Sequence, residues 1–156
     1  LIWMIKKITL TILLLLFLNN CGYQPIYSSK NVKFAVGELT TIGDKKVNKL
    51  LIKKLEIYNN DDLSKIIYNL NITSESTKNI SSKDTKGNPA TFTLTLLVKL
   101  EIKNSLGEKN SQSFKQYTTY NNNNNKFDLR KYEDSIKENM TESINEDIIQ
   151  YLQNLN

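Results

Sequence analysis

The chain has 156 residues, of which 39% are hydrophobic and 24% are charged, and this is enough apolar content for one modest folded domain. It contains no histidine and one cysteine, which excludes His-dependent nucleophile systems, Cys/His zinc sites and an internal disulfide. The formal net charge is +5, and two of the basic residues lie in the first 20 positions.

The N-terminal segment has the layout of a secretory signal peptide. Lys6 and Lys7 precede an apolar run of about eleven residues, 8–18. A permanent membrane-spanning helix needs roughly 20 apolar residues. We therefore interpret residues 1–20 as a signal peptide, with a short membrane anchor or a buried helix as alternatives. Met4 is a better candidate for the start of translation than Leu1.

The single cysteine, Cys21, directly follows this segment at the position where a signal peptidase would cut. The position resembles a bacterial lipobox, in which Leu18 matches the expected apolar residue, whereas Asn20 departs from the usual small one. We expect residues 21–31 to form a lipidated tether with fatty acids such as palmitate on Cys21, because several acyl chains make a stable anchor. An incidental buried thiol is the alternative. In lipoproteins of this kind, a residue other than aspartate after the cysteine, here Gly22, implies delivery to the outer membrane.

The mature chain has a small positive charge. Removal of residues 1–20 leaves 19 basic and 16 acidic residues, a net charge of +3. No basic run is interleaved with aromatic residues, so we expect no nucleic-acid partner. We expect residues 32–156 to form a single domain.

The first half of this domain predicts a strand, a helix and a second strand. Residues 33–39 predict the first strand. The spacing of Thr41 and Asp44 is that of a capping box and predicts the start of an amphipathic helix of about four turns. Its basic side can contact an anionic surface or simply be solvated. Residues 66–73 alternate between apolar and polar and predict a half-buried strand, which residues 73–89 extend before a loop. The apolar positions of the helix are Val47, Leu50, Leu51, Leu55 and Tyr58.

Residues 90–102 carry the strongest strand pattern, with apolar residues at even positions and polar residues at nearly all odd ones. Straight, this strand would exceed roughly 40 Å, so we expect it to bend or project. Residues 104–108 predict a hairpin turn, and residues 109–120 the return strand. Pairing of Lys103 with Lys109 places Val98 opposite Phe114 and puts both on the apolar face.

The C-terminal segment predicts a helix of about 25 residues. Asp128 is the expected N-cap, and Phe127 with Tyr132 has the spacing of a hydrophobic staple. The order of elements predicts an α+β fold, with two helices packed on one face of a mixed four-stranded β-sheet as an α/β sandwich. The other face of the sheet is either exposed to solvent or covered by a binding partner. The apolar stripe of the helix comprises Leu129, Tyr132, Ile136, Met140, Ile144, Ile148, Tyr151 and Leu155.

The sequence predicts no catalytic or metal site. Adjacent carboxylates on a helix diverge by about 100°, so such pairs do not converge in a cleft. No calcium loop or glycine-rich phosphate loop is present. We expect no enzyme activity and no cofactor other than the covalent lipid on Cys21. The adjacent pairs are Asp61 with Asp62, Glu133 with Asp134, and Glu146 with Asp147.

Lysines at odd positions of the predicted hairpin form the candidate ligand contact. They lie on the polar face near the turn and are able to meet the phosphates of an anionic lipid head group. Protection of an exposed sheet against aggregation is the alternative reason for them. These residues are Lys99, Lys103, Lys109 and Lys115.

Residues 21–27 (CGYQPIY) resemble the mature start of the lipopolysaccharide-assembly lipoprotein (LptE) family, although Ser28 stands where that pattern usually has glycine. Tyr120 with Asn121, and Asp147 with Ile148, are similar to the C-terminal half of that family. The order of elements matches the family's fold.

This resemblance implies an outer-membrane lipoprotein on the periplasmic face, lipid-anchored at Cys21. It implies a plug and assembly partner of an LptD-type β-barrel, able to contact lipopolysaccharide during its transport and insertion, and not an enzyme. The four hairpin lysines are our own candidates for that contact. Another small outer-membrane accessory lipoprotein, such as a secretion pilot or a transporter auxiliary subunit, is the alternative, followed by a periplasmic enzyme.

Overall fold

The computed structural model describes residues 32–59 and 65–155. The predictions for Cys21, for segments 1–20 and 21–31, and for Asp61 with Asp62 lie outside these residues. Neither of the α-helices within the described ranges is both long enough and apolar enough to cross a membrane.

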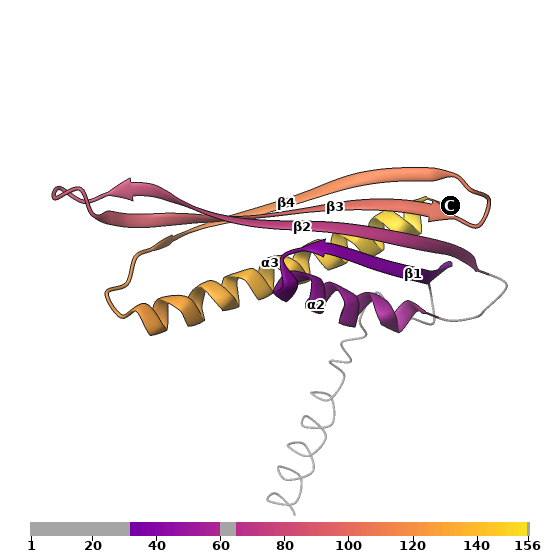
Figure 1. Cartoon of the computed structure of the whole chain (residues 1–156), viewed down its shortest axis with the longest axis horizontal. Coiled ribbons are helices and arrows are strands. Elements are labelled where there is room, and N and C mark those ends of the chain that lie inside the picture. Colours follow the sequence, from indigo (N-terminus) through magenta and orange to yellow (C-terminus); the bar gives the residue numbers. More distant parts are fainter. Residues whose placement is uncertain (1–31, 60–64, 156) are drawn as a thin grey trace, which may run out of the picture.

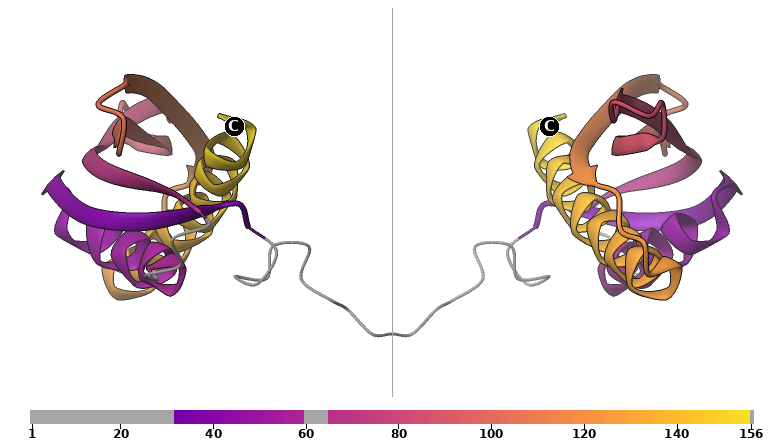
Figure 2. Two further views of the ribbon diagram at one scale, coloured as in Figure 1. Left: turned by 90° about the vertical axis from the view of Figure 1, so that its right-hand side faces the viewer. Right: turned by 90° about the vertical axis from the view of Figure 1, so that its left-hand side faces the viewer.

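The described chain forms one sheet covered on one face by two helices (Figures 1 and 2), which confirms the predicted fold class. The sheet order is β1-β2-β3-β4, with β1 parallel to β2 and the other pairs antiparallel. The elements in chain order are β1 (Phe34–Gly43), α2 (Lys45–Leu55), the 3-10 helix η1 (Glu56–Tyr58), β2 (Ile66–Lys83), β3 (Pro89–Asn104), β4 (Lys109–Asn121) and α3 (Lys126–Asn154).

The long hairpin follows the alternation in the sequence. Even positions of β3 face the helices, and Leu96, Val98 and Leu100 are fully buried. Lys103 pairs with Lys109 and Val98 with Phe114, so the predicted register is confirmed. The strands twist along their length, and the turn between β2 and β3 projects past the start of α3 (Figure 1). Residues 73–83 extend β2, also as predicted.

Helix α2 begins later than the capping-box spacing predicted. Residues 41–43 belong to β1, and Asp44 is the N-cap, with Oδ1 accepting hydrogen bonds from the backbone N–H groups of Lys46 and Val47 at 3.0 and 3.2 Å. The helix has 11 residues instead of about four turns, and η1 follows it. The extended backbone of β1 is held to β2 by sheet pairing as far as Gly43, so the helix cannot start earlier.

Helix α3 begins earlier than predicted and has 29 residues. Asn125, not Asp128, is its N-cap, because Asn125 Oδ1 accepts from the N–H groups of Phe127 and Asp128 at 3.1 and 3.4 Å. With Asn125 as the N-cap, Phe127 is the second residue of the helix and not the residue before the cap, so the predicted staple is wrong. Phe127 and Tyr132 are 55% and 54% exposed. Ile149 and Leu152 are buried outside the predicted stripe, because α3 packs against both the sheet and α2.

Candidate functional site

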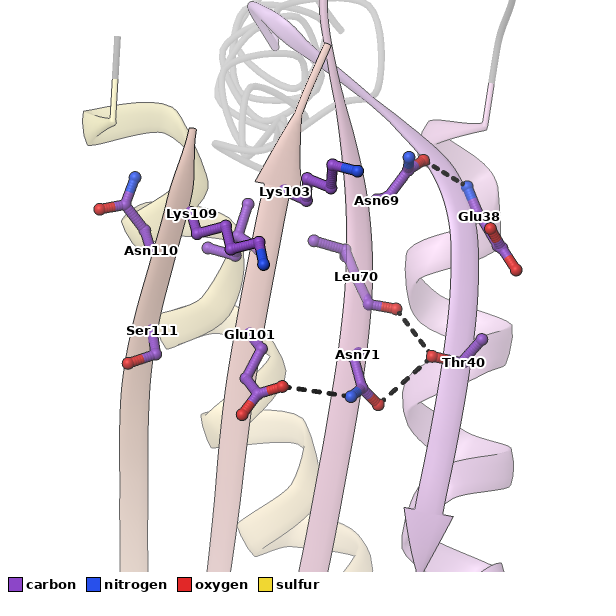
Figure 3. Close-up of a pocket in the computed structure, with 11 residues that line it drawn as sticks. Glu38, Thr40, Asn69, Leu70, Asn71, Glu101, Lys103, Lys109, Asn110 and Ser111 are labelled. Carbon is purple, nitrogen blue, oxygen red and sulfur yellow. Dashed lines mark hydrogen bonds between the residues drawn. The ribbon is translucent and has the colours of Figure 1, made fainter. Parts of the chain in front are cut away.

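An open hollow of about 530 Å³ lies on the helix-free face of the sheet, near the turn between β3 and β4 (Figure 3). All four strands contribute to it, because odd positions of β2, β3 and β4 point away from the helices. Its polar lining includes Glu38, Thr40, Asn69, Asn71, Glu101, Lys103, Lys109 and Ser111.

One wall of the hollow depends on an irregularity in β1. The register shifts between Val36 and Leu39, and Gly37 lies within the shift. A Cβ on Gly37 would come 2.4 Å from Asn69 Oδ1, so only glycine leaves room for the asparagine side chain. Asn69 Oδ1 accepts a hydrogen bond from the N–H of Glu38 at 2.9 Å. The bulge and Asn69 therefore fix each other in place.

A chain of side-chain hydrogen bonds crosses the floor of the hollow. Thr40 Oγ1 donates to Asn71 Oδ1 at 3.3 Å, and Asn71 Nδ2 donates to Glu101 Oε2 at 3.2 Å (Figure 3). Lys99 Nζ donates to Glu101 Oε1 at 2.7 Å. This hydrogen bond and the charge of Lys99 lower the pKa of the Glu101 carboxyl. Glu101 is thus engaged on both oxygens, and its partner Lys99 is neutralised.

The structure separates the four candidate lysines into two groups. Lys103 and Lys109 line the hollow and face each other directly across β3 and β4, and Figure 3 shows both side chains extending over it. No ion pair is found for either of them within residues 32–59 and 65–155. Lys99 is paired with Glu101, and Lys115 lies opposite Leu97, outside the lining. Like charges at directly opposite positions of two strands repel each other, so an anion bound between Lys103 and Lys109 would be stabilised.

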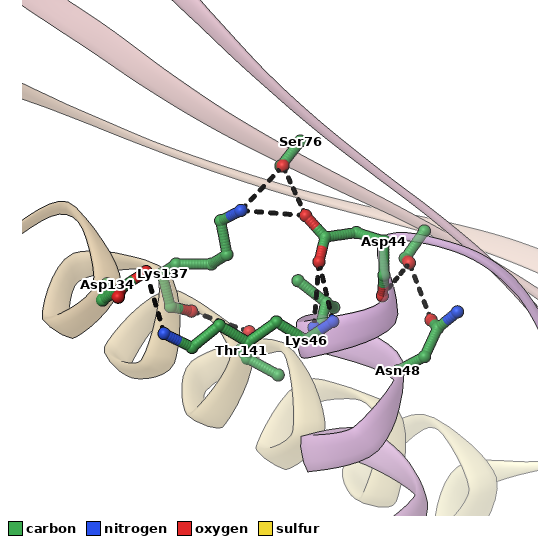
Figure 4. Close-up of polar contacts among 9 residues, drawn as sticks. Asp44, Lys46, Asn48, Ser76, Asp134, Lys137 and Thr141 are labelled. Atoms are coloured by element: carbon green, nitrogen blue, oxygen red, sulfur yellow. Dashed lines mark hydrogen bonds and ion pairs between the residues drawn. The ribbon is translucent and has the colours of Figure 1, made fainter. Parts of the chain in front are cut away.

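A second polar cluster joins three elements on the other side of the sheet (Figure 4). Asp44 Oδ2 accepts from Ser76 Oγ at 2.6 Å and from Lys137 Nζ at 2.8 Å, and Lys137 also donates to Ser76 at 3.0 Å. Partial burial acts to raise the pKa of Asp44, but the hydrogen bonds from Lys137, Ser76 and the N–H of Val47 outweigh it and hold that pKa well below its usual range. No sequence pattern indicates this cluster, because Lys137 is 93 residues away from Asp44.

A third cluster lies where the start of α3 approaches β4. Tyr120 Oη donates to Glu133 Oε1 at 2.7 Å, and Lys78 forms an ion pair with the same carboxylate. Lys78 Nζ also lies 4.0 Å from the centroid of the Phe92 ring. Burial raises the pKa of the Tyr120 phenol, and the bond to the negatively charged Glu133 raises it further.

The adjacent carboxylates on α3 either bind different partners or face solvent. Glu133 binds Lys78 on β2, whereas its neighbour Asp134 binds Lys46 on α2 at 2.8 Å. The two side chains therefore diverge, as the helical geometry predicted. Glu146 and Asp147 are both exposed. In the part of the chain that the structure describes, no three acidic, cysteine or histidine side chains gather as metal ligands would.

The fold is similar to those of several solved lipoproteins. It superposes on the rare lipoprotein B from Shewanella oneidensis with a TM-score of 0.54 and 14% identity, covering 76% of this chain and 98% of that one. For an uncharacterized lipoprotein B from Nitrosomonas europaea the TM-score is 0.58 at 12% identity, with 85% and 90% coverage. For a minor lipoprotein from Acinetobacter baumannii it is 0.50 at 12% identity, with 75% and 90% coverage. No protein-family model and no curated protein matches the chain. The chain thus shares the fold of these lipoproteins.

Proposed function

We propose that this chain is an outer-membrane lipoprotein, held on the periplasmic face by fatty acids on Cys21. It acts as plug and assembly partner of an LptD-type β-barrel in lipopolysaccharide transport and insertion. The observation that carries the proposal is the fold shared with rare lipoprotein B, combined with a cysteine placed directly after an apolar leader. It is a binding and assembly function, and it requires no cofactor beyond the attached lipid.

Lipopolysaccharide contact is assigned to the hollow on the helix-free face. Lys103 and Lys109 present two opposed ammonium groups without ion-pair partners among the described residues. Phosphate groups on a lipid head group would bridge them through charge-assisted hydrogen bonds. Lys99 and Lys115 flank this pair and are secondary candidates, since Lys99 is already bound to Glu101.

The remainder of the helix-free face suits a polar environment such as the lumen of a wide barrel. Thr93 on β3 shares hydrogen bonds with Ser81 on β2 and with Thr119 on β4, the latter at 2.9 Å. Ser82 and Thr91 hydroxyls lie 2.8 Å apart farther along the same face. These serine and threonine side chains are uncharged, and their hydroxyl groups both donate and accept hydrogen bonds.

The test is isolation of the tagged protein from a detergent extract of its own cell envelope. The proposal expects a stable one-to-one complex with a β-barrel protein, bound lipopolysaccharide, and a mature N-terminus whose mass matches an acylated Cys21. A Cys21→Ala variant is the control for anchoring. Isolation of the acylated protein with no barrel attached would contradict the proposal. A secretion component or transporter in place of the barrel would favour an accessory lipoprotein of another system.

The enzyme alternative has its own test. Glu133→Gln and Asp147→Asn remove one carboxylate from each pair on α3. If both variants support envelope assembly as well as the unchanged protein does, an activity that depends on Glu133 or Asp147 is excluded. Loss of an activity in folded Asp147→Asn protein would support an enzyme instead, because Asp147 is exposed and has no ion pair among the described residues.

A further inference from the structure

Helix α2 is unusually one-sided in charge. Its eleven residues include five lysines and no acidic residue. Lys46 binds Asp134 at 2.8 Å, and Lys54 binds Glu142 at 2.6 Å, so both point toward α3. The three other lysines are exposed and have no ion pair among residues 32–59 and 65–155. These three, which we call the lysine row, are Lys45, Lys49 and Lys53.

The lysine row points away from the rest of the domain. Its members are four residues apart, so they align along one side of the helix over about 12 Å. Val47, Leu51 and Leu55 face the sheet and are fully buried, and α3 occupies the side of Lys46 and Lys54. Two acidic residues flank the row: Asp44, directly before Lys45, is bound to Lys137, and Glu56, one turn after Lys53, is exposed. Three positive charges therefore face solvent, with Glu56 as the exposed negative charge beside them.

The surface next to the row offers polar groups as well as charge. An open hollow of about 420 Å³ lies beside its first two members, Lys45 and Lys49. Thr41 and Asn48 contribute polar groups to the lining, and Ile52 contributes an apolar one. Such a lining suits a phosphate-bearing head group with an apolar portion.

The C-terminal end of the row is near the end of the domain at which the described chain begins. The described chain begins at Val32, directly before β1, and Phe34 on β1 packs against Tyr58 at the end of α2 and η1, with ring centroids 5.5 Å apart. Figure 1 shows the start of β1 and the C-terminal end of α2 at the same end of the domain. The chain from Cys21 to Val32 spans at most about 40 Å when fully extended. An acylated Cys21 would thus keep this end of the domain within about 40 Å of the bilayer.

We propose that the lysine row is a membrane-contact surface that binds anionic phospholipid head groups of the leaflet carrying the anchor, and thereby orients the domain on the membrane. The inference rests on the proposed lipid anchor at Cys21. Each lysine close to an anionic surface increases the binding constant by about fivefold. Dissolved salt screens this attraction and limits it to a short range. Three aligned lysines therefore distinguish a charged bilayer from an uncharged one.

The experiment uses the mature, acylated protein reconstituted into vesicles, with amine-reactive labelling of each lysine followed by mass spectrometry. One set of vesicles is pure phosphatidylcholine, and the other contains one-third phosphatidylglycerol. We expect labelling of the lysine row to be slower by about fivefold or more on the anionic vesicles, and the difference to disappear in 0.5 M salt, at which screening acts over about 4 Å. Lys83 and Lys86, at the far end of β2 and in its turn, should label equally on both.

Two double variants with the same change in net charge distinguish membrane contact by the lysine row from an effect of the protein's overall charge. Lys49→Glu with Lys53→Glu should restore fast labelling of Lys45 on anionic vesicles, whereas Lys83→Glu with Lys86→Glu, the same change in charge, should not. Equal labelling of the row on both vesicle types, with the protein still floating with the vesicles, would overturn this inference and leave the anchor intact. Protein that does not float, with an unmodified Cys21, would overturn the anchor and this inference together. Protection of the row only after a barrel partner is added would assign it to a protein interface and overturn the membrane contact.

Discussion

Lys137 Nζ lies 2.8 Å from Asp44 Oδ2 and connects α3 to the junction between β1 and α2. The other oxygen of the same carboxylate caps α2, and Ser76 on β2 completes the cluster. One side chain thus satisfies backbone groups at a helix start and links three elements. The Asp44 and Lys137 side chains are only 17% and 20% exposed, so water screens their interaction weakly.

Removal of this carboxylate should destabilise the domain. We expect Asp44→Ala to lower the free energy of unfolding by about 1–3 kcal/mol, because it removes an N-cap and leaves Lys137 partly buried without its partner. Asp44→Asn should cost less, since asparagine is also a good N-cap. Urea denaturation at pH 7 measures both. Equal stability of Asp44→Ala and the unchanged protein would contradict the role of the cluster.

The stability difference between the unchanged protein and Asp44→Asn should depend on pH. The pKa of Asp44 in the folded state lies below its unfolded value of about 3.9, so the unfolded chain takes up the proton first as the pH falls. The stabilisation by the charged carboxylate is full above about pH 4 and is lost as the pH falls below it toward the folded pKa. Unfolding curves between pH 2 and 6 should therefore converge at the acidic end, and a constant difference would contradict the prediction.

Tyr120→Phe should destabilise the domain by about 1–2 kcal/mol, because it removes the hydrogen bond to the Glu133 carboxylate but keeps the ring packing against Phe92. The folded pKa of Tyr120 is raised above the ordinary value near 10, so this contribution is full below about pH 10 and is lost as the pH rises beyond it. Alkaline unfolding curves of the two proteins should converge above pH 10. In an absorbance titration, the unchanged protein should show one more ionising tyrosine than Tyr120→Phe, and this tyrosine should ionise at a higher pH than an ordinary one.

Gly43→Ala should cost several times more stability than Gly87→Ala. Both glycines have positive φ, 108° and 84°. A Cβ on Gly43 would lie 1.9 Å from the carbonyl oxygen of Ser74, whereas a Cβ on Gly87 meets nothing within 4 Å. The control variant carries only the left-handed backbone penalty of about 1–2 kcal/mol. Thermal unfolding compares the two, and similar losses in both variants would contradict the close contact at Gly43.

Lys103→Glu separates folding from ligand binding at the hollow. The change converts two opposed lysines into an opposite-charge pair with Lys109, so the free energy of unfolding should rise by about 0.2–1 kcal/mol. Binding of lipopolysaccharide should nevertheless weaken, more strongly so in Lys103→Glu with Lys109→Glu, and the effect should shrink with salt. Lys115→Glu should have a smaller effect, and Lys86→Glu is the remote control. Unchanged binding at low salt in the double variant would refute the assignment.

The sequence predicted the hairpin well and the helix starts poorly. The alternation over 90–102, broken by Leu97, together with the short turn at 104–108 favours the register that puts Val98 opposite Phe114 on the apolar face, and the structure has this register. A helix start depends on which of several nearby polar side chains accepts hydrogen bonds from the first N–H groups of the helix, and the sequence offers more than one candidate. Asn125 caps α3 although Asp128 is an equally good cap by residue type, and Thr41 stays in β1 because the sheet holds it.

The amino-acid sequence by itself determined the fold class, the register of the β3–β4 hairpin and the absence of histidine and paired-cysteine chemistry, because these depend on residue type and on spacing between near neighbours. The tertiary structure decided which charges remain free. Lys99, Lys103 and Lys109 are alike in the sequence, but Glu101 neutralises the first and leaves the other two opposed. Lys46 and Lys54 likewise form ion pairs with carboxylates of α3, far along the chain. The other three lysines of α2 have no ion pair among the described residues. Pairing between side chains that are distant in the sequence depends on how the helices pack on the sheet, so sequence spacing does not predict it.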